Sequence, residues 1–176
     1  LKMAAGVMSM MSGGTFVYYG EEIGMISKGG QNSDPAKRIA MKWQAKNIYE
    51  GCCYLPPEGT PWDETSYYYP SVEEQQADPN SILNYYKEAM ELRNRFPSIA
   101  RGKVEYHPTP NNYICIITKE YRDEKITIVF NMDTFDQTVN LGDFNLGCSQ
   151  MVGTLYAMGG QCSYDAGGVL AMPGQS

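Results

Sequence analysis

Residues 13–25 read GGTFVYYGEEIGM, and this stretch decides the expected fold. Its short apolar and aromatic run, residues 15–19, lies between glycines and is followed by two adjacent carboxylates, Glu21 and Glu22. A continuous apolar run of this length is typical of a strand that is covered on both faces, as in parallel sheets. Because parallel α/β sheets bind ligands at the carboxyl ends of their strands, we expect the carboxylates to lie at such an edge.

The residues before this stretch indicate a helix. Residues 1–12 are rich in methionine and alanine and end at Ser12, which two glycines follow. This pattern is typical of a buried helix that terminates at glycine. A helix, a glycine turn and a strand make up the second half of a βαβ unit. Since one strand cannot form a sheet by itself, the neighbours of the strand at 15–19 are expected elsewhere.

The amino-acid composition limits the kinds of protein that this chain can be. The 176 residues are 43% hydrophobic and 19% charged, which predicts a packed globule. A net charge of −6 argues against a nucleic-acid partner, which needs a basic surface, and no apolar run is long enough to predict a membrane span. The five cysteines form no C-x-x-C pair and His107 is the only histidine, so we expect buried free thiols rather than a zinc site. The compartment stays undetermined.

A long loop region follows the first strand. Residues 26–77 show little periodicity and many glycines and prolines, and loops of this length often carry function. Asp34 and Arg38 are the candidate functional residues of this loop, because a guanidinium offers a planar fork of hydrogen-bond donors to a ligand or to an acidic neighbour. A local ion pair between the two is the alternative. Aromatic residues that could present flat faces to a ligand or anchor the loop are Trp43, Trp62, Tyr67, Tyr68 and Tyr69.

The clearest single element is a helix over residues 79–96. Asp78 suits its N-cap and Pro79 its first position. Apolar and aromatic residues then recur at helical spacing, namely Ile82, Tyr85, Tyr86, Ala89, Leu92 and Phe96. Pro97 is expected to stop the helix.

After Pro97 the pattern changes to short strands with turn signals about every ten residues. The expected strands are 104–106, 113–121, 125–131, 137–141, 151–156 and 169–172, with a hairpin turn at 122–124. This spacing indicates an antiparallel sandwich. We therefore expect two domains, residues 1–97 and residues 98–176.

Together these segments resemble the α-amylase superfamily, glycoside hydrolase family 13. Residues 15–25 are similar to the last strand of the family's barrel, and the series Asp34, Arg38, Met41 and Trp43 resembles the segment after it. Residues 75–86 with Leu92 and Arg93 resemble the eighth barrel helix, and residues 98–176 resemble the family's C-terminal β-domain. Phe16 and Ala40 depart from the family, which often has proline there.

The resemblance implies a fold and an activity. The fold would be an α+β fragment, the end of a (β/α)8 TIM barrel followed by an antiparallel β-sandwich. The parent enzyme would be a retaining glycoside hydrolase of the α-glucosidic bonds in starch or malto- and isomalto-oligosaccharides. In this family the nucleophile Asp, the acid/base Glu and a stabilising Asp come from earlier strands, and none of their motifs occurs here. No catalytic residue is therefore assigned, and Asp34 and Arg38 would border the pocket for the nonreducing sugar.

Glu22 is expected to be a structural carboxylate. Side chains of adjacent residues diverge along an extended segment, so Glu21 and Glu22 make a poor catalytic pair. We expect Glu22 to be buried with a charged or hydrogen-bonded partner and Glu21 to be partly exposed.

The expected partners are an α-glucan or oligosaccharide and the remainder of the parent polypeptide. No cofactor is expected in this chain, and calcium, if bound, would be held by the preceding domains. The loop carboxylates Asp63, Glu64, Glu73 and Glu74 fit no EF-hand, and a solvated or calcium-bridging role stays open. Two other functions remain, a non-catalytic relative resembling a transporter heavy chain and a carbohydrate-binding module centred on the β-domain.

Overall fold

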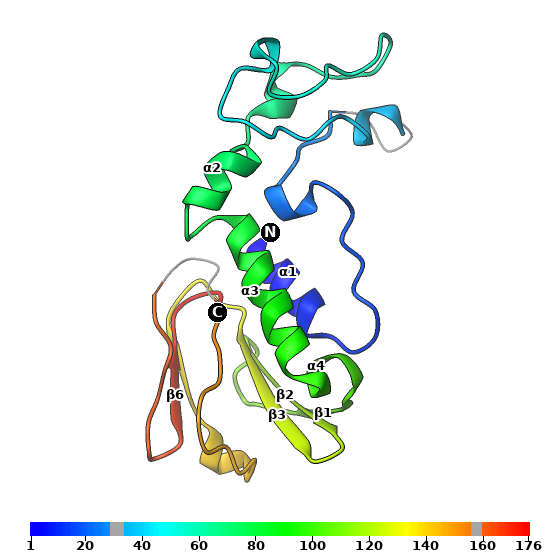
Figure 1. Ribbon diagram of the computed structural model, residues 1–176. Helices are drawn as coiled ribbons and strands as arrows, with labels where there is room; N and C mark the ends of the chain where they lie inside the picture. Colours follow the sequence, from blue (N-terminus) through cyan, green and yellow to red (C-terminus); the bar gives the residue numbers. More distant parts are fainter. Residues whose placement is uncertain (29–33, 156–159) are drawn as a thin grey trace. The chain divides into compact units, whose positions relative to one another are not determined.

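The computed structural model describes residues 1–28, 34–155 and 160–176, which form two compact units (Figure 1). The first, here called the β unit, comprises Leu1–Thr15 together with Tyr85–Ser176. The second, here called the loop unit, comprises Phe16–Asn84. The chain thus leaves the β unit after its first helix and returns to it along a second helix.

The β unit contains three helices and two antiparallel sheets in its described part. The helices are α1 (Lys2–Met10), α3 (Ile82–Arg95, which begins in the loop unit) and α4 (Pro97–Arg101). The first sheet has the order β1 (Lys103–His107), β2 (Ile114–Tyr121), β3 (Glu124–Asn131). The second has the order β4 (Gln137–Asn140), β6 (Val169–Met172), β5 (Ser163–Tyr164), and a 3-10 turn, η5, covers Leu141–Phe144.

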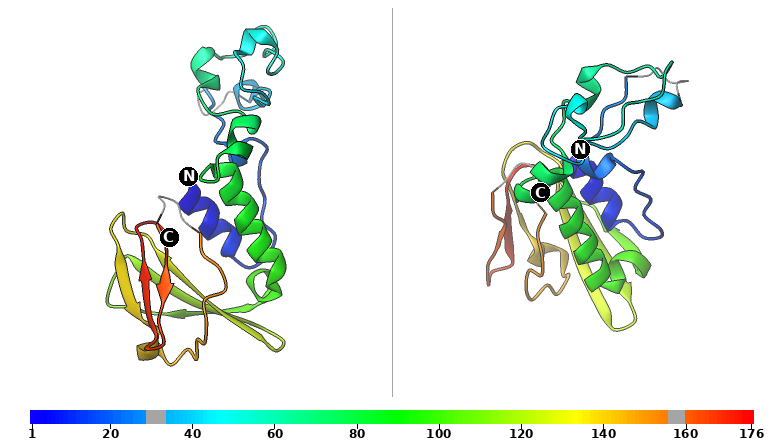
Figure 2. Two further views of the ribbon diagram at one scale, coloured as in Figure 1. Left: turned by 60° about the vertical axis from the view of Figure 1, so that its left-hand side comes forward. Right: turned by 45° about the horizontal axis from the view of Figure 1, so that its top comes forward.

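The two sheets and the helices lie in layers, because β2 alternates apolar residues between its faces (Figure 2). Ile117 packs with Met10 of α1 and Ala89 of α3. Ile116, its neighbour along the strand, packs instead with Leu170 of the second sheet. The first sheet is therefore the middle layer, with the helices on one face and the second sheet on the other.

The hairpin between β2 and β3 has the turn that the sequence predicts. Tyr121 stands opposite Glu124, so Arg122 and Asp123 form the two-residue connection. Arg122 has a φ of 55°, the left-handed conformation that such tight turns require.

Two buried cations hold the end of α1. The Arg93 guanidinium donates to the carbonyl oxygens of Ser9 and Met11, each at 2.6 Å, and to that of Gly13. The Lys119 ammonium, on β2, donates to the carbonyl of Met10 and, at 2.6 Å, to that of Ile99. The last turn of a helix leaves carbonyls without intrahelical partners and carries negative partial charge, which explains why cations lie there.

Lys119 makes the stability of the chain depend on pH. The side chain is 0% exposed, and burial together with the charge of Arg93 lowers its pKa to about 8. Between this value and the ordinary lysine pKa of about 10.4, the unfolded chain binds more protons than the folded chain, so the Lys119 contribution to stability rises with pH.

We expect the free energy of unfolding of the wild type to rise, relative to that of Lys119→Met, between pH 7.5 and pH 10, by on the order of 2 kcal/mol. Urea unfolding of both proteins at the two pH values measures this difference, because groups other than Lys119 cancel in the comparison. A difference that stays constant with pH would show that Lys119 titrates normally.

The loop unit has little regular structure. Its elements are the 3-10 turns η1 (Glu21–Ile23), η2 (Pro35–Lys37), η3 (Ile48–Glu50) and η4 (Glu64–Tyr67) and the short helix α2 (Val72–Ala77). A core cluster of buried residues holds it together, namely Ile23, Ile39, Ile48, Cys52, Tyr67 and Tyr69. The buried Gln75 amide ties distant segments by donating to the carbonyls of Ile23 and Pro70, each at 2.8 Å.

The prediction of a strand at residues 15–19 is wrong. These residues adopt no strand, and Phe16 is 90% exposed. A strand needs neighbours that pair with its backbone, and no described strand pairs with this segment.

Other elements also begin or end differently from the expectation, and one expected strand is absent from its described residues. Asp78 accepts the N–H of Asn80 in a turn, and α3 begins at Ile82 because the Ser81 hydroxyl caps the N–H of Asn84 at 3.1 Å. Pro97 does not end helical structure but begins α4. In the predicted strand 151–156, the described residues 151–155 form no strand, and residue 156 lies outside the described residues.

Candidate functional site

Asp34 and Arg38 form an exposed ion pair. The 3-10 turn η2 between them brings the residues together across four positions, with Arg38 Nη2 2.5 Å from Asp34 Oδ2. The side chains are 69% and 65% exposed, respectively. The pair that the sequence singles out is thus assembled, and the remaining guanidinium N–H groups are accessible to solvent. Exposed pairs of this kind contribute little to the stability of a fold.

Two tyrosines from the glycine-rich stretch lie near this pair. Tyr19 donates a hydrogen bond to the carbonyl of Ile39, the residue after Arg38, at 3.3 Å. Burial and the neighbouring Tyr18 raise the pKa of Tyr19, and the positive charge of Arg38 opposes this rise. The rings of Tyr18 and Tyr19 are 4.9 Å apart and both are exposed. The candidate site therefore combines an ionic pair with two exposed aromatic rings.

Our sequence analysis missed these tyrosines because it assigned residues 15–19 to a covered strand. The signal that could have found them is their place just before the acidic pair, at the end of the presumed strand. Aromatic faces next to a fork of hydrogen-bond donors are an arrangement suited to a sugar ring with its hydroxyls.

The adjacent carboxylates serve the local backbone. Glu22 Oε2 accepts the N–H of Gly20 at 2.8 Å, and Glu21 Oε2 accepts the N–H of Tyr18 at 3.3 Å. Gly20 has a φ of 91°, a left-handed conformation that favours glycine. Glu21 is exposed, as expected, whereas Glu22 is half-buried rather than buried. The turn lets Glu22 reach back to the N–H of the buried Gly20, and the half-buried carboxylate does not need the charged partner that full burial would require.

The other aromatic residues of the loop divide into core and surface. The Trp62 ring packs edge-on against the Tyr67 ring, with the ring centroids 6.0 Å apart. The Tyr67 and Tyr69 rings are stacked, with their centroids 6.4 Å apart. These three anchor the loop unit. Trp43 and Tyr68 are exposed and remain free to contact a ligand.

The loop carboxylates act as caps and surface charges. Asp63 caps η4 and pairs with Lys28 at 3.5 Å, Glu73 accepts the N–H of Ala45, and Glu74 forms a capping box with Ser71. Among residues 1–28, 34–155 and 160–176, no three histidine, cysteine or acidic side chains gather into a group that could hold a metal ion. No helix in this part of the chain is long and apolar enough to span a membrane.

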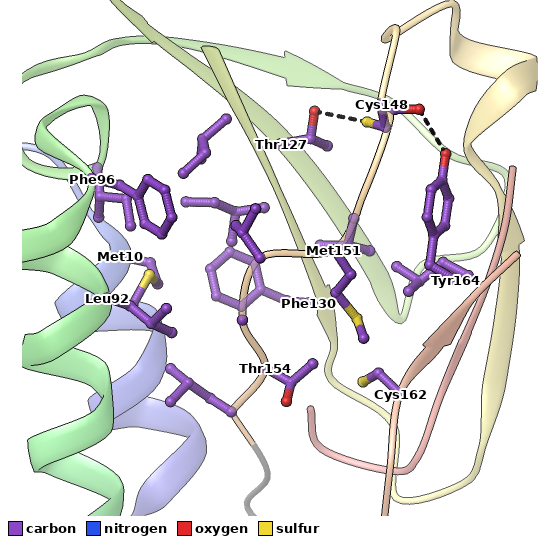
Figure 3. Close-up of a pocket in the computed structure, with 18 of the residues that line it drawn as sticks. Met10, Leu92, Phe96, Thr127, Phe130, Cys148, Met151, Thr154, Cys162 and Tyr164 are labelled. Carbon is purple, nitrogen blue, oxygen red and sulfur yellow. Dashed lines mark hydrogen bonds between the residues drawn. The ribbon is translucent and has the colours of Figure 1, made fainter. Parts of the chain in front are cut away.

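The β unit contains an apolar cavity of about 400 Å³ (Figure 3). Met10, Leu92 and Phe96 line it from the helices, and Phe130 lines it from β3. On one side of the cavity, polar groups of the lining residues hydrogen-bond to one another. The Cys148 thiol donates to the Thr127 hydroxyl, and the Tyr164 hydroxyl donates to the Cys148 carbonyl. Among the described residues, no group of three histidine, cysteine or acidic side chains gathers at the cavity, so the candidate site remains the Asp34–Arg38 pair.

Comparison with known proteins identifies the family. The model of the α-amylase catalytic domain matches residues 1–102. The chain belongs to the α-amylase family. This confirms the family resemblance that the sequence motifs indicate, and the matched range contains every residue of the candidate site.

Individual relatives agree with this assignment. The chain is 31% identical over 143 residues to "Alpha-amylase 3" of Dictyoglomus thermophilum, covering 80% of this chain and 27% of that protein. It is 28% identical over 149 residues to "Trehalose synthase" of Thermus thermophilus, covering 80% of this chain and 15% of that protein. The solved structure of "Eubacterium rectale Amy13B" superposes with a TM-score of 0.84 at 34% identity and covers 98% of this chain and 32% of that one. The chain spans less than a third of the length of each.

Proposed function

We propose that this chain is the C-terminal part of a retaining, α-amylase-like glycoside hydrolase that acts on α-glucosidic bonds of starch or of malto- and isomalto-oligosaccharides. The observation that carries the proposal is the match of the α-amylase catalytic domain to residues 1–102, which include the exposed Asp34–Arg38 pair. Residues 1–97 would contribute the end of a (β/α)8 barrel, and residues 98–176 would form the β-sandwich domain that follows it.

The exposure of the glycine-rich stretch supports this assignment. Phe16 and Tyr18 would lose most of their exposed apolar surface if residues 15–19 paired with neighbouring barrel strands. The backbone of residues 15–17 makes no hydrogen bond within the described part of the chain, and pairing would give it the hydrogen bonds of a strand ladder. The preceding strands of the enzyme are the natural source of these neighbours.

Catalysis in the proposed enzyme needs carboxylates from those preceding strands. A retaining mechanism uses a nucleophile and an acid/base about 5–5.5 Å apart across the scissile bond. Glu21 and Glu22 hold the backbone of the turn around Gly20 and are not arranged as such a pair. The role of this chain is thus to bind and position the sugar.

Within this role, Arg38 donates hydrogen bonds to sugar hydroxyls while Asp34 fixes the guanidinium plane. The exposed faces of Tyr18 and Tyr19 are suited to pack against the ring carbons of a glucose unit. Such contacts hold the substrate against the reacting groups and reduce the entropy cost of reaching the transition state.

The purified chain is expected to hydrolyse neither starch nor small α-glucosides, since nothing in it replaces the general acid and the nucleophile. A longer protein that contains this chain together with the preceding barrel strands should hydrolyse them. Reducing-sugar and chromogenic-glucoside assays on both proteins measure this. Turnover by the chain alone, or a longer protein that lacks carboxylates at its barrel strand ends, would contradict the proposal.

Substitutions in the longer protein separate binding from folding. Arg38→Gln should lower kcat/KM by about 10-fold to 100-fold, the cost of one or two hydrogen bonds to a charged group. Asp63→Asn is the matched control, because Asp63 is an exposed, ion-paired loop residue of the same unit. If Arg38→Gln and Asp63→Asn lower kcat/KM by the same factor, Arg38 lies outside the substrate pocket.

A further inference from the structure

Two arginines meet one tyrosine at the end of the β2–β3 hairpin, in the β unit, and take no part in the proposed function. Arg101 Cζ lies 6.0 Å from the centroid of the Tyr121 ring, and Arg122 Cζ lies 5.2 Å from it. Arg101 is the last residue of α4, whereas Tyr121 ends β2 and Arg122 begins the hairpin turn. The fold thus brings two guanidinium groups from separate elements to one phenol, and we call these three residues the Tyr121 corner.

The two positive charges of the Tyr121 corner are not paired with carboxylates. Across residues 1–28, 34–155 and 160–176, neither Arg101 nor Arg122 forms an ion pair. Both side chains are exposed, so a ligand can reach them from solvent. Like charges held against one ring repel each other, and an anion bound between them removes this repulsion.

The acidic residues of the hairpin do not fill this place. Glu120 points to the opposite face of the sheet from Tyr121, because side chains alternate along a strand, and it stands opposite a lysine on each neighbouring strand. Glu124 stands opposite Tyr121, but its Oε1 accepts the N–H of Ser98 at 2.7 Å. The exposed Asp123 of the turn is the remaining carboxylate, against two guanidinium groups.

The Tyr121 hydroxyl belongs to the same arrangement. The pKa of Tyr121 is lowered, first by the hydrogen bond that the Arg101 guanidinium donates to the phenol oxygen and then by the charge of Arg122. A phenol oxygen that accepts from a guanidinium still has its own O–H to donate. The corner therefore offers a ligand two cationic forks and one hydroxyl donor.

The backbone of Arg122 gives independent support for a use of its side chain. Its φ of 55° is left-handed, and glycine is the usual residue where a tight hairpin turn needs this conformation. Arginine at such a position is strained, and strained positions gather at functional sites.

We propose that the Tyr121 corner binds a phosphate group, either as a phosphate monoester of a sugar or as free phosphate. The terminal oxygens of the phosphate accept from the forks of Arg101 and Arg122, which match them in geometry, and one oxygen accepts from the Tyr121 hydroxyl. Binding makes and breaks no covalent bond. Because the site is open to solvent, we expect a Kd of about 1 mM at low ionic strength and weaker binding as salt is added.

Nuclear magnetic resonance titrations of the full chain test the site. We expect sodium phosphate and glucose 6-phosphate to shift the amide and side-chain N–H signals of Arg101 and Arg122, and glucose at the same concentrations to leave them unchanged. Affinity for glucose 6-phosphate at least about 3-fold above that for phosphate identifies the monoester as the ligand. Equal or tighter binding of inorganic phosphate identifies the free anion.

Variants test whether both guanidinium groups hold the phosphate. Arg101→Gln and Arg122→Asn should each weaken phosphate binding by about 10-fold or more, the value of a hydrogen-bonded contact to a charged group. Asparagine tolerates the left-handed φ, so the turn is kept. Arg95→Gln is the matched control and should bind as the wild type does, because Arg95 is an exposed arginine that lies 4.8 Å from a single ring, that of Phe96.

Three results would overturn the proposal. The first is the absence of shifts at Arg101 and Arg122 with either phosphate compound up to about 20 mM, which is far above the expected Kd. The second is a set of shifts that maps to other residues of the chain. The third is a loss of affinity in Arg95→Gln that equals the loss in Arg101→Gln. The signal mapping uses the wild type, so it decides the question even if a variant fails to fold.

Discussion

Replacing Arg93 with methionine is expected to lower the free energy of unfolding by about 3–5 kcal/mol. The guanidinium is the donor for the carbonyls of Ser9, Met11 and Gly13, which lie at and beyond the end of α1. Methionine fills a similar volume but donates nothing, so buried carbonyls lose their partners, at about 1–3 kcal/mol for each that stays dry. Urea unfolding followed by circular dichroism measures the loss.

Arg95→Met is the matched control for this experiment. Arg95 lies on the same helix and donates to the carbonyl of Val152, but the contact is exposed. Water replaces the lost donor there, so the expected loss is below about 1 kcal/mol. If both variants lose the same stability, helix propensity or general charge explains the result, and the capping role of Arg93 is wrong.

Replacing Phe96 with aspartate should lower the free energy of unfolding by about 3–5 kcal/mol. The Phe96 ring packs with the cluster of Met10, Ile117 and Phe130 and lines the cavity of the β unit (Figure 3). The substitution removes this apolar contact and places a carboxylate against hydrocarbon. The melting temperature should fall clearly, and the unfolding midpoint in urea should move with it.

Phe135→Asp provides the comparison. Phe135 is a phenylalanine of the same unit whose side chain is exposed, so the same chemical change removes little packing. Its melting temperature should stay near that of the wild type. A fall in Phe135→Asp that equals the fall in Phe96→Asp would indicate a general charge effect rather than packing of Phe96 on the sheet.

Local patterns predicted much of the β unit. The hairpin around Arg122 and the strands that pair in it follow from alternation and turn residues, which act between neighbours in the chain. Strand β5 is only two residues long, which is too short to show an alternating pattern in the sequence. Likewise, Asp78 and Ser81 are both good cap residues, and only the contacts of Asn84 show which one caps α3.

The candidate site was predicted in part. Asp34 and Arg38 stand four residues apart, and a single turn suffices to pair them, so the sequence could identify the pair. Tyr19 meets the carbonyl of Ile39 across twenty residues of irregular chain, and no periodic signal predicts such a contact. The capping box of Ser71 and Glu74 was visible in the sequence and was overlooked.

The sequence by itself determined the family, through the glycine-rich stretch and the motifs that follow it. It also determined the elements whose signals are local, such as α3 and the β2–β3 hairpin. Only the tertiary structure decided that Arg93 and Lys119 are buried cations at the end of α1, that Cys52 and Cys53 share a core with Tyr67, and that residues 15–19 are uncovered. The burial and the hydrogen-bond partners of a residue depend on segments that lie far apart in the chain. The residues next to it in the sequence therefore do not predict them.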